Sequence, residues 1–550
     1  MSFKIPYAVL SEQDRKDIAR DCVLTETMCY SRGKQKFFQK PKTLKFYNTN
    51  ESDGTISIPM YYASELFSRN QINRVRNFWK IPPFNMSPGF ELRDYQKMSI
   101  ELAFGHYNKY STAFFNVYCS YGKTTLGAYT ASVFSHQYSL LTLVTYHRIL
   151  IGKSWIQTFR ENTDAVIYIV GETKGPIPDN VQVILCMDTR IGNLSTEILS
   201  RVGHLVIDEA HCYCTEKKGQ MLLNIQPLFL TLLTATYKRK DGFHKMLDLM
   251  AGPVKITRVA PKQFFVFHIP TPFTANPGEN SFGMIHSELI DEFDNNDCRN
   301  SMLLQTVMDN IDEKIMIVFA HRATAVRFYY WCLQYFVHMG KRVSLLAGDI
   351  NEYEDGDIIV ATRSKVGTGF DEKGSCRAWE GRRINFLINA NSVRSFEQLG
   401  GRSFRADIPV IVTFGDSHSN VKSQWQENVR LFNKQNGVVI ELEQCQRFCW
   451  ALMRETVLEQ YREEGERRAK EIYEREIKLD LQNTVAGKLV SSRRVKETSS
   501  EETQEEATYH PPSPPPSGST SQSSYKRIDP RANVESLAED MASKYAHLIF

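Results

Sequence analysis

The stretch of sequence that decides the fold is Ala113-Phe-Phe-Asn-Val-Tyr-Cys-Ser-Tyr-Gly-Lys-Thr-Thr125. An apolar, strand-forming run leads into Gly122, Lys123 and Thr124, and a helical pattern follows. A strand, a tight turn and a helix in this order place backbone N–H groups around an anion. The lysine can meet the β- and γ-phosphates of a nucleotide, and the threonine hydroxyl can hold Mg²⁺. The segment therefore predicts a phosphate-binding loop.

The loop departs from the usual pattern at two positions. Val117 stands where Gly or Ala is common, and Ser120 stands where many such loops have a further Gly. We expect a serine to hold this turn only if its backbone angles are not strongly left-handed. Taken alone, Gly-Lys-Thr is also compatible with a chance turn before a helix. The candidate contacts of the loop with a nucleotide are Ser120, Tyr121, Gly122, Lys123, Thr124 and Thr125.

A second signal lies downstream, where Leu205-Val-Ile-Asp-Glu-Ala-His211 places two acids at the end of an apolar strand. The carboxyl edge of a parallel sheet is where ligand chemistry is found in such folds. Asp208 can hold Mg²⁺ together with Thr124, and Glu209 can position and deprotonate an attacking water. Charge at a buried strand end is costly without a partner, and a metal-bound triphosphate is such a partner. The two segments together predict ATP and Mg²⁺ as ligands, with Lys123, Asp208 and Glu209 as catalytic residues.

Short apolar runs alternate with helix-length segments in two successive series. This alternation predicts an α/β fold with two tandem lobes, each a parallel sheet with helices on both faces. We expect the first lobe over 89–258 and the second over 262–440. The predicted strands are 113–118, 140–145, 181–185 and 204–208 in the first lobe, and 315–319, 357–361, 384–388 and 410–414 in the second.

Four further regions flank the lobes. Residues 1–88 match no chemical motif and are taken as an accessory region. A charged helical extension is expected over 441–498. The Ser-, Glu- and Pro-rich composition of 499–533 predicts a disordered linker. A short amphipathic helix over 534–550 could dock on the body of the protein or on a protein partner.

The composition of the chain limits the classes of protein to which it can belong. The chain has 550 residues, 42% hydrophobic and 24% charged, with a formal net charge of +4, so a nucleic-acid site must be a local groove. No run approaches about 20 uncharged apolar residues, and no secretory signal begins the chain, so we expect no membrane partner and an intracellular location. Eleven cysteines lie without the spacing of a disulfide framework or a zinc site.

Taken together, these motifs resemble those of superfamily 2 helicases over about residues 89–420. The resemblance implies RecA-like lobes. In Leu92-Arg-Asp-Tyr-Gln96 it implies that Gln96 contacts adenine. Leu233-Thr-Ala-Thr236 is similar to the motif that couples hydrolysis to movement between lobes. The implied coupling residues are Thr234, Ala235, Thr236 and His211.

The second lobe carries two more segments similar to family motifs. Val366-Gly-Thr-Gly-Phe-Asp371 looks like the fifth, with Gly369 and Asp371 near the nucleotide. Gln398-Leu-Gly-Gly-Arg-Ser-Phe-Arg405 matches the sixth and adds Gln398 to the nucleotide site. The resemblance makes Arg405 the first choice for an arginine finger, with Arg402 contacting or supporting the γ-phosphate.

The finer resemblance is to helicases of large cytoplasmic DNA viruses, such as the poxvirus transcript-release helicase, and to the xeroderma pigmentosum group B branch. A viral relationship implies the host cytoplasm or the virion as location. In such enzymes DNA or RNA runs across both lobes through phosphate contacts. The candidate nucleic-acid contacts, each of which could also be a plain surface arginine, are Arg148, Arg190, Arg322 and Arg363.

Three functions remain open at this point. The first is an ATPase that moves along DNA, in viral transcription or replication. The second keeps the motor but makes RNA its track, in transcript release or RNA remodelling. The third is a nucleotide-binding interaction protein whose motor has decayed, which the altered loop at Ser120 would suit.

Overall fold

The computed structural model describes residues 1–27, 41–66, 80–280, 283–367, 370, 372–392, 405–443 and 447–483, and the helical backbone of 484–498. Met1–Tyr473 form one compact unit, which contains both predicted lobes, and Glu474–Phe550 form a second. The predicted linker at 499–533 and the predicted helix at 534–550 lie outside the described residues. Among the described helices, none is both long enough and apolar enough to cross a membrane.

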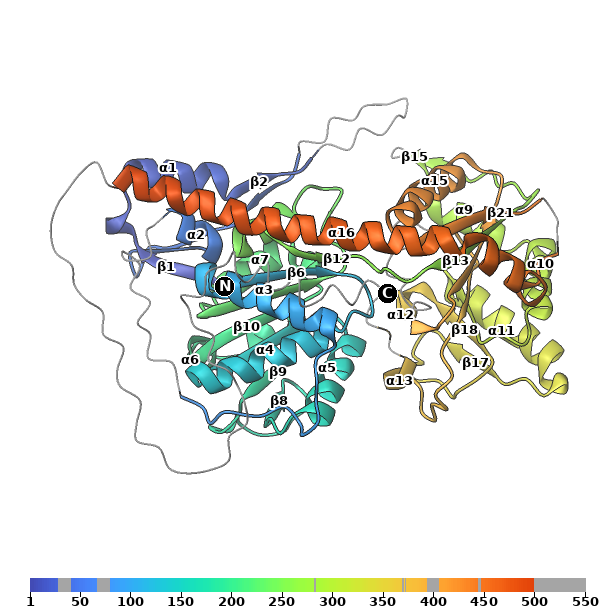
Figure 1. The fold of residues 1–550 in the computed structure, drawn as a ribbon, viewed down its shortest axis with the longest axis horizontal. Coiled ribbons are helices and arrows are strands. Elements are labelled where there is room, and N and C mark those ends of the chain that lie inside the picture. The colour runs from blue at the N-terminus through green and yellow to red at the C-terminus, as the bar shows by residue number, and fades with distance from the viewer. Residues whose placement is uncertain are drawn as a thin grey trace. The chain divides into compact units, whose positions relative to one another are not determined.

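The first lobe is built on a seven-stranded parallel sheet (Figure 1). Its order is β12-β6-β11-β10-β7-β9-β8, and every neighbouring pair is parallel. The strands are β6 (Thr112–Val117), β7 (Leu141–Tyr146), β8 (Ile167–Ile169), β9 (Val183–Met187), β10 (Val202–Asp208), β11 (Phe229–Thr234) and β12 (Ile256–Arg258). The four strands predicted for this lobe are confirmed to within one or two residues at each end.

Apolar cores cover both faces of this sheet. One face packs against α3 (Asp94–Tyr110), α4 (Lys123–Tyr138) and α5 (Ile149–Asn162). The other packs against α7 (Glu216–Leu223) and α8 (Lys245–Ala251). Burial on both faces explains why the strands read as continuous apolar runs and not as alternating ones.

The second lobe repeats the plan with a parallel sheet of order β17-β18-β16-β19-β20-β13-β21. The α/β class with two tandem parallel sheets is therefore confirmed. The strands are β13 (Phe264–Pro270), β16 (Ile315–Phe319), β17 (Val343–Leu346), β18 (Ile358–Thr362), β19 (Phe386–Asn389), β20 (Val410–Gly415) and β21 (Gly437–Glu441). The larger helices are α9 (His286–Asp294), α10 (Asp297–Asp309), α11 (Arg322–Phe336) and α15 (Ser419–Lys434), and short α12 (Arg363–Val366) and α13 (Glu372–Ser375) follow β18.

The N-terminal region carries small antiparallel sheets. One has the order β1-β5-β4 and the other pairs β2 with β3. Met1 is fully buried, and the Ser2 hydroxyl donates to the Leu223 carbonyl at 2.6 Å, so the chain start is fastened to the end of α7. Phe46 and Met60 join the core of the first sheet. The elements are β1 (Ser2–Pro6), α1 (Glu12–Asp21), β2 (Val23–Thr25), β3 (Thr43–Lys45), β4 (Asn48–Asn50), β5 (Thr55–Pro59) and α2 (Met60–Leu66).

The charged extension forms one helix, α16 (Trp450–Thr498). Its start is not solvated, because Trp450 is buried and packs on Phe265 and Phe267 of β13. Further along, the Gly465 carbonyl accepts a hydrogen bond from Asn436 at 2.8 Å. The beginning of the predicted charged extension is therefore buried and completes the core of the second lobe, which Val457 of α16 also joins.

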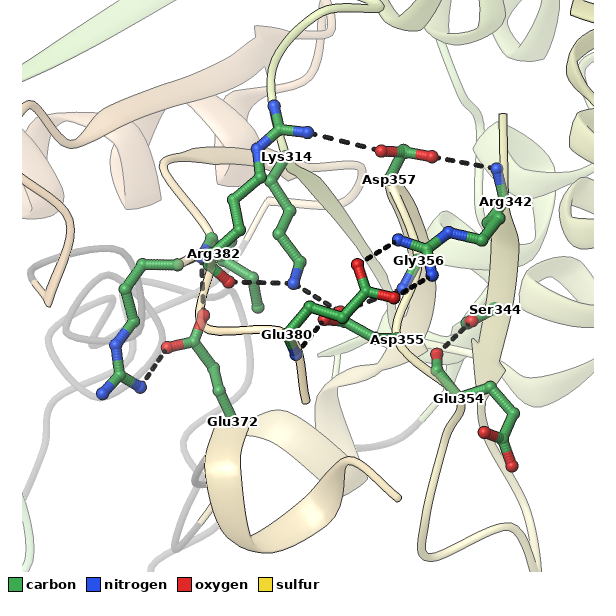
Figure 2. Close-up of polar contacts among 12 residues, drawn as sticks. Lys314, Arg342, Ser344, Glu354, Asp355, Gly356, Asp357, Glu372, Glu380 and Arg382 are labelled. Atoms are coloured by element: carbon green, nitrogen blue, oxygen red, sulfur yellow. Dashed lines mark hydrogen bonds and ion pairs between the residues drawn. The ribbon is translucent and has the colours of Figure 1, made fainter. Parts of the chain in front are cut away.

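A buried ion pair joins the amino ends of three strands in the second lobe (Figure 2). Lys314, just before β16, pairs with Asp355, and each side chain is at most 3% exposed. The Lys314 ammonium also donates to the Arg382 carbonyl at 2.9 Å, and Asp355 accepts from the Glu380 amide at 2.9 Å. Nearby, Arg342 and Glu380 form a two-bond ion pair in which both side chains are more than half exposed.

Replacing Lys314 by Met should lower the free energy of unfolding by about 3 kcal/mol, because it leaves the Asp355 carboxylate buried without its cation. The matched change Arg342→Met should cost less than about 1 kcal/mol, because water already solvates that pair. Denaturant unfolding of both variants, followed by circular dichroism, checks this. Equal losses in the two variants would contradict it.

Candidate active site

The predicted site residues of the first lobe meet at the carboxyl edge of its sheet. β6 runs into the phosphate loop, β10 ends at Asp208, and β11 ends at Thr234. These three strands are neighbours in the order β6-β11-β10. Parallel strands point their carboxyl ends the same way, so the loop, the two acids and the coupling segment share one edge.

The loop uses two left-handed backbone positions before α4. Gly122, which caps the helix, has φ +96°, and Ser120 has φ +75°. The expectation that Ser120 would avoid this region is wrong. A side chain costs about 1 kcal/mol in left-handed backbone, and the fixed surroundings of the loop offset that cost.

Those surroundings begin with Tyr121, which is buried. Its hydroxyl donates to the Tyr95 carbonyl at 2.6 Å and lies 2.6 Å from the Ser99 hydroxyl. The Gln96 side chain donates to the Tyr121 carbonyl at 2.9 Å and accepts from the Arg93 amide at 3.0 Å. Gln96 therefore anchors the loop, a role that the sequence did not indicate; its contact with adenine stays a prediction.

Gln96 also explains why Gly122 is required. A Cβ atom at position 122 would lie 2.3 Å from the Gln96 amide nitrogen, so the Gln96 side chain would have to shift away from its hydrogen bond to the loop. Both the positive φ and this close approach favour glycine at position 122. The position of Lys123, the first residue of α4, follows from this turn.

The two acids are nearly buried, and they face the loop lysine. Asp208 is 4% exposed and Glu209 is 7% exposed. The Lys123 ammonium lies 3.8 Å from a Glu209 carboxylate oxygen. Glu209 has φ +49°, which turns the chain sharply at the end of β10. A lysine and two carboxylates at this spacing can hold a phosphate chain, a divalent cation and a water together.

Trp155 of α5 is a site residue that sequence reasoning missed. Its indole N–H donates to Asp208 at 2.9 Å, and the ring is fully buried. The other Asp208 oxygen accepts from the Glu209 amide at 2.8 Å. Burial, and then the charge of Glu209, raise the pKa of Asp208 to about 6, while Lys123 and Trp155 act in the opposite direction. A buried tryptophan in an amphipathic helix looks like core, so no sequence signal marked it.

The coupling residues meet the acids through His211. Its Nδ1 lies 2.8 Å from the Thr234 hydroxyl and 3.5 Å from a Glu209 oxygen. The Thr236 amide donates to that same hydroxyl at 3.1 Å, and Ala235 lies buried between the two threonines. Burial lowers the pKa of His211. The neutral His211 imidazole therefore links Glu209 to Thr234 at the end of β11.

One predicted residue of the second lobe reaches the loop. The Arg405 guanidinium donates through Nε to the Ser120 hydroxyl at 3.2 Å. The predicted partners Gly369, Asp371, Gln398 and Arg402 lie outside the described residues.

A cleft of about 960 Å³ contains this constellation. Its volume falls in the range of small-molecule sites. Its described lining includes Gln96, Tyr95 and Phe90 on one side and Ser154 and Thr158 of α5 on another. Six of the described lining residues are cations and three are acids, which suits a polyanion. The cations are Arg93, Lys123, Lys262, Lys373, Arg383 and Arg405, and the acids are Glu91, Asp208 and Glu209.

The donor set in the cleft fits Mg²⁺. The Thr124 hydroxyl and the Asp208 carboxylate supply two hard oxygens, and Mg²⁺ takes its remaining ligands from water and phosphates. Three or more metal-binding side chains do not gather anywhere in the described part of the chain. A metal here would therefore depend on the nucleotide for part of its coordination.

The four arginines predicted to contact nucleic acid all follow carboxyl ends of strands. Arg148 donates to the Ser364 carbonyl of the second lobe at 2.8 Å. Arg190 donates to the Val170 carbonyl at 2.8 Å, and Arg363 to the Asn391 and Ser392 carbonyls at 3.3 and 3.4 Å. The side chain of Arg322 is 65% exposed. Their contact with nucleic acid stays a prediction.

Comparisons with known proteins bear on the first lobe most directly. Residues 89–239 match the family model described as "Type III restriction enzyme, res subunit". The chain is 23% identical over 389 residues to "Putative helicase 161L" of Invertebrate iridescent virus 6, covering 66% of this chain and 85% of that protein. It is 24% identical over 207 residues to a "Putative ATP-dependent RNA helicase" of Acanthamoeba polyphaga mimivirus, covering 37% of this chain and 38% of that protein.

A solved structure of a Dbp5 variant of S. cerevisiae, bound to RNA and ADP BeF3, is 14% identical with a TM-score of 0.44, covering 66% of this chain and 93% of that one. The sequence matches relate the chain to superfamily 2 helicases and to helicase-named proteins of iridoviruses and a mimivirus. This relationship holds at the level of the superfamily.

The raised pKa of Asp208 gives a pH-dependent stability. Between its ordinary value of 3.8 and about 6, the unfolded chain is ionised while the folded protein binds a proton, so stability falls as pH rises through this window. Asp208→Asn should therefore stabilise the nucleotide-free protein at pH 8 by on the order of 2–3 kcal/mol, with a smaller gain at pH 5. Denaturant unfolding at both pH values measures this.

Asp179→Asn is the matched control, because the Asp179 side chain is 80% exposed. It should change stability little at either pH. A destabilised Asp208→Asn protein at pH 8 would show that the carboxylate is well stabilised in the fold, contrary to this account.

Proposed function

We propose that the protein is an ATP hydrolase of the helicase type, which uses Mg²⁺-ATP to move along or remodel a nucleic acid. The observation that carries the proposal is the meeting of Lys123, Asp208 and Glu209 with Arg405 of the other lobe in one cationic cleft. A motor needs site residues from both lobes, because only groups that meet across the cleft can couple hydrolysis to movement of one lobe relative to the other.

The residues take distinct roles in this proposal. Lys123 and the loop amides bind the β- and γ-phosphates, and Thr124 and Asp208 hold Mg²⁺, which neutralises phosphate charge when bound. Glu209 orients the attacking water and accepts its proton. Arg405 leaves the Ser120 hydroxyl and stabilises charge on the transferring phosphoryl group.

The His211 contacts give the proposal a route from chemistry to movement. A change at the γ-phosphate alters the Glu209 carboxylate first, and His211 passes it to Thr234 at the end of β11. On the other side, the Cys212 thiol lies 3.6 Å from His147, which directly precedes Arg148. The Cys212 thiol also lies 3.4 Å from His211, so three side-chain contacts join the predicted nucleic-acid segment to the Glu209 carboxylate.

The track is proposed as DNA, in viral transcription or replication, with RNA as the alternative. The iridovirus and mimivirus relatives support a place among helicases of large cytoplasmic DNA viruses, and the mimivirus relative is named for RNA. The segment Asp208-Glu-Ala-His211 supports assignment to DEAH-type helicases. The interaction-protein alternative rests on the altered phosphate loop, in which Ser120 stands where many such loops have Gly.

Phosphate release from Mg²⁺-ATP should rise several-fold on adding the correct polymer, because closure of the lobes brings Arg405 to the phosphates. Single-stranded DNA, duplex DNA and RNA are compared, and the best activator names the track. Glu209→Gln should lower the rate of ATP hydrolysis at least about 100-fold, while ATP binding persists.

The matched control is Glu216→Gln, an exposed acid in the first turn of α7. It should hydrolyse ATP like the unaltered protein. Strong ATP turnover by Glu209→Gln would show that Glu209 is not the general base. ATP binding without hydrolysis on any polymer would favour the interaction-protein alternative.

A further inference from the structure

Arg383 is a cleft residue that no motif assigns. It lies between α13 and β19, and its side chain is 33% exposed. Its Nη1 donates to the Glu372 carboxylate at 3.0 Å. Glu372, which begins α13 directly after the fifth-motif segment, is 1% exposed and also accepts from the Ile384 amide at 2.6 Å. Figure 2 shows Glu372 directed at this chain segment from its short helix.

A second contact fixes the guanidinium from its face. The Arg383 guanidinium carbon lies 4.4 Å from the centre of the Trp379 ring. Arginine stacks on aromatic faces while its edge donors stay available for anions. A buried carboxylate at one edge and a ring on one face restrict a side chain that is otherwise flexible, so less entropy is lost when it binds a ligand.

The charges around Arg383 indicate what that ligand is. Every charged residue that the described second lobe contributes to the cleft is a cation: Lys262, Lys373, Arg383 and Arg405. Lys262 donates to the Ala406 carbonyl, and Lys373 pairs with Glu161 of α5 at 3.0 Å. Arg383 instead is held by Glu372, a carboxylate of its own lobe. The guanidinium has five N–H donors, and the contact with Glu372 uses one of them.

We propose that Arg383 contacts the phosphate chain of the bound nucleotide, as an anion-binding residue of the second lobe additional to the sixth-motif arginines. Glu372 is its positioning residue. This inference rests on the proposed nucleotide site. Because Glu372 adjoins the fifth-motif segment, it also links that segment to the phosphates through one buried carboxylate.

The neighbouring arginine provides a matched control. Arg382 precedes the same strand and bears the same charge, but its guanidinium pairs with Asp357 at 3.3 Å and donates to the Asp312 carbonyl. Figure 2 shows Arg382 and Asp357 in the network at the amino ends of the strands. Arg382 is not among the described residues that line the cleft.

The experiment measures the affinity of the full-length protein for fluorescent ATP, ADP and AMP, together with KM and kcat for ATP, in Arg383→Gln and Arg382→Gln. Arg383→Gln should weaken ATP binding and raise KM about tenfold, the loss of a charged hydrogen bond. AMP binding should stay unchanged, and Arg382→Gln should behave like the unaltered protein. Weaker binding of ATP alone places the contact on the γ-phosphate, and equal weakening of ADP places it on the β-phosphate.

Two further variants separate positioning from folding. Arg383→Lys keeps the charge and should recover part of the affinity, which a merely structural role would not predict. Glu372→Gln should weaken ATP binding less than Arg383→Gln. Equal affinities in the Arg383 and Arg382 variants, or an equal loss for AMP, would overturn the inference. An unaltered protein that binds no ATP would overturn the proposed function instead.

Discussion

The candidate active site depends on two buried carboxylates at the end of β10 that face one lysine. Asp208 and Glu209 are adjacent and nearly buried, and burial together with the charge of Glu209 raises the pKa of Asp208. Two carboxylates that face one lysine leave a local deficit of positive charge, which a bound cation would offset. In the proposed function Mg²⁺ would supply part of it, and the nucleotide that carries the metal would bring the phosphates to Lys123. Binding of a cation would thus relieve an electrostatic cost that the two acids impose on the folded protein.

Backbone strain collects at the same edge of the sheet. Ser120, Gly122 and Glu209 all adopt left-handed angles within this one site. Such angles persist only where contacts with the surrounding structure hold the backbone in place. In the phosphate loop these contacts come from α3, because Gln96 and the Tyr95 carbonyl both hydrogen-bond to Tyr121. The loop is consequently preformed, and a bound phosphate need not organise it.

The fold could be predicted because parallel strands covered on both faces are continuous apolar runs with sharp ends, as 204–208 and 315–319 show. The site was predictable where chemistry demands a residue type in a fixed order, as at Lys123 and Asp208. Trp155, the anchoring role of Gln96 and the Glu372–Arg383 pair were not, because each depends on a partner distant in sequence. A tryptophan in a helix or an arginine before a strand has the same local pattern whether or not it meets a ligand. The left-handed Ser120 was mispredicted for the same reason, since tertiary contacts override local preference.

The distribution of charge between the lobes explains how nucleotide could drive their motion. The first lobe contributes all three acids of the described cleft lining, while the second contributes only cations. Exposed ion pairs also join the lobes along α5, Lys153 with Glu352 at 2.6 Å and Glu161 with Lys373 at 3.0 Å. Exposed pairs are each worth less than about 1 kcal/mol, so they guide the lobes together without holding them. In the proposed function, a triphosphate between Lys123 and the cations of the second lobe would add a stronger attraction, which hydrolysis and phosphate release would remove. The free-energy difference between closed and open lobes then follows the charge in the cleft.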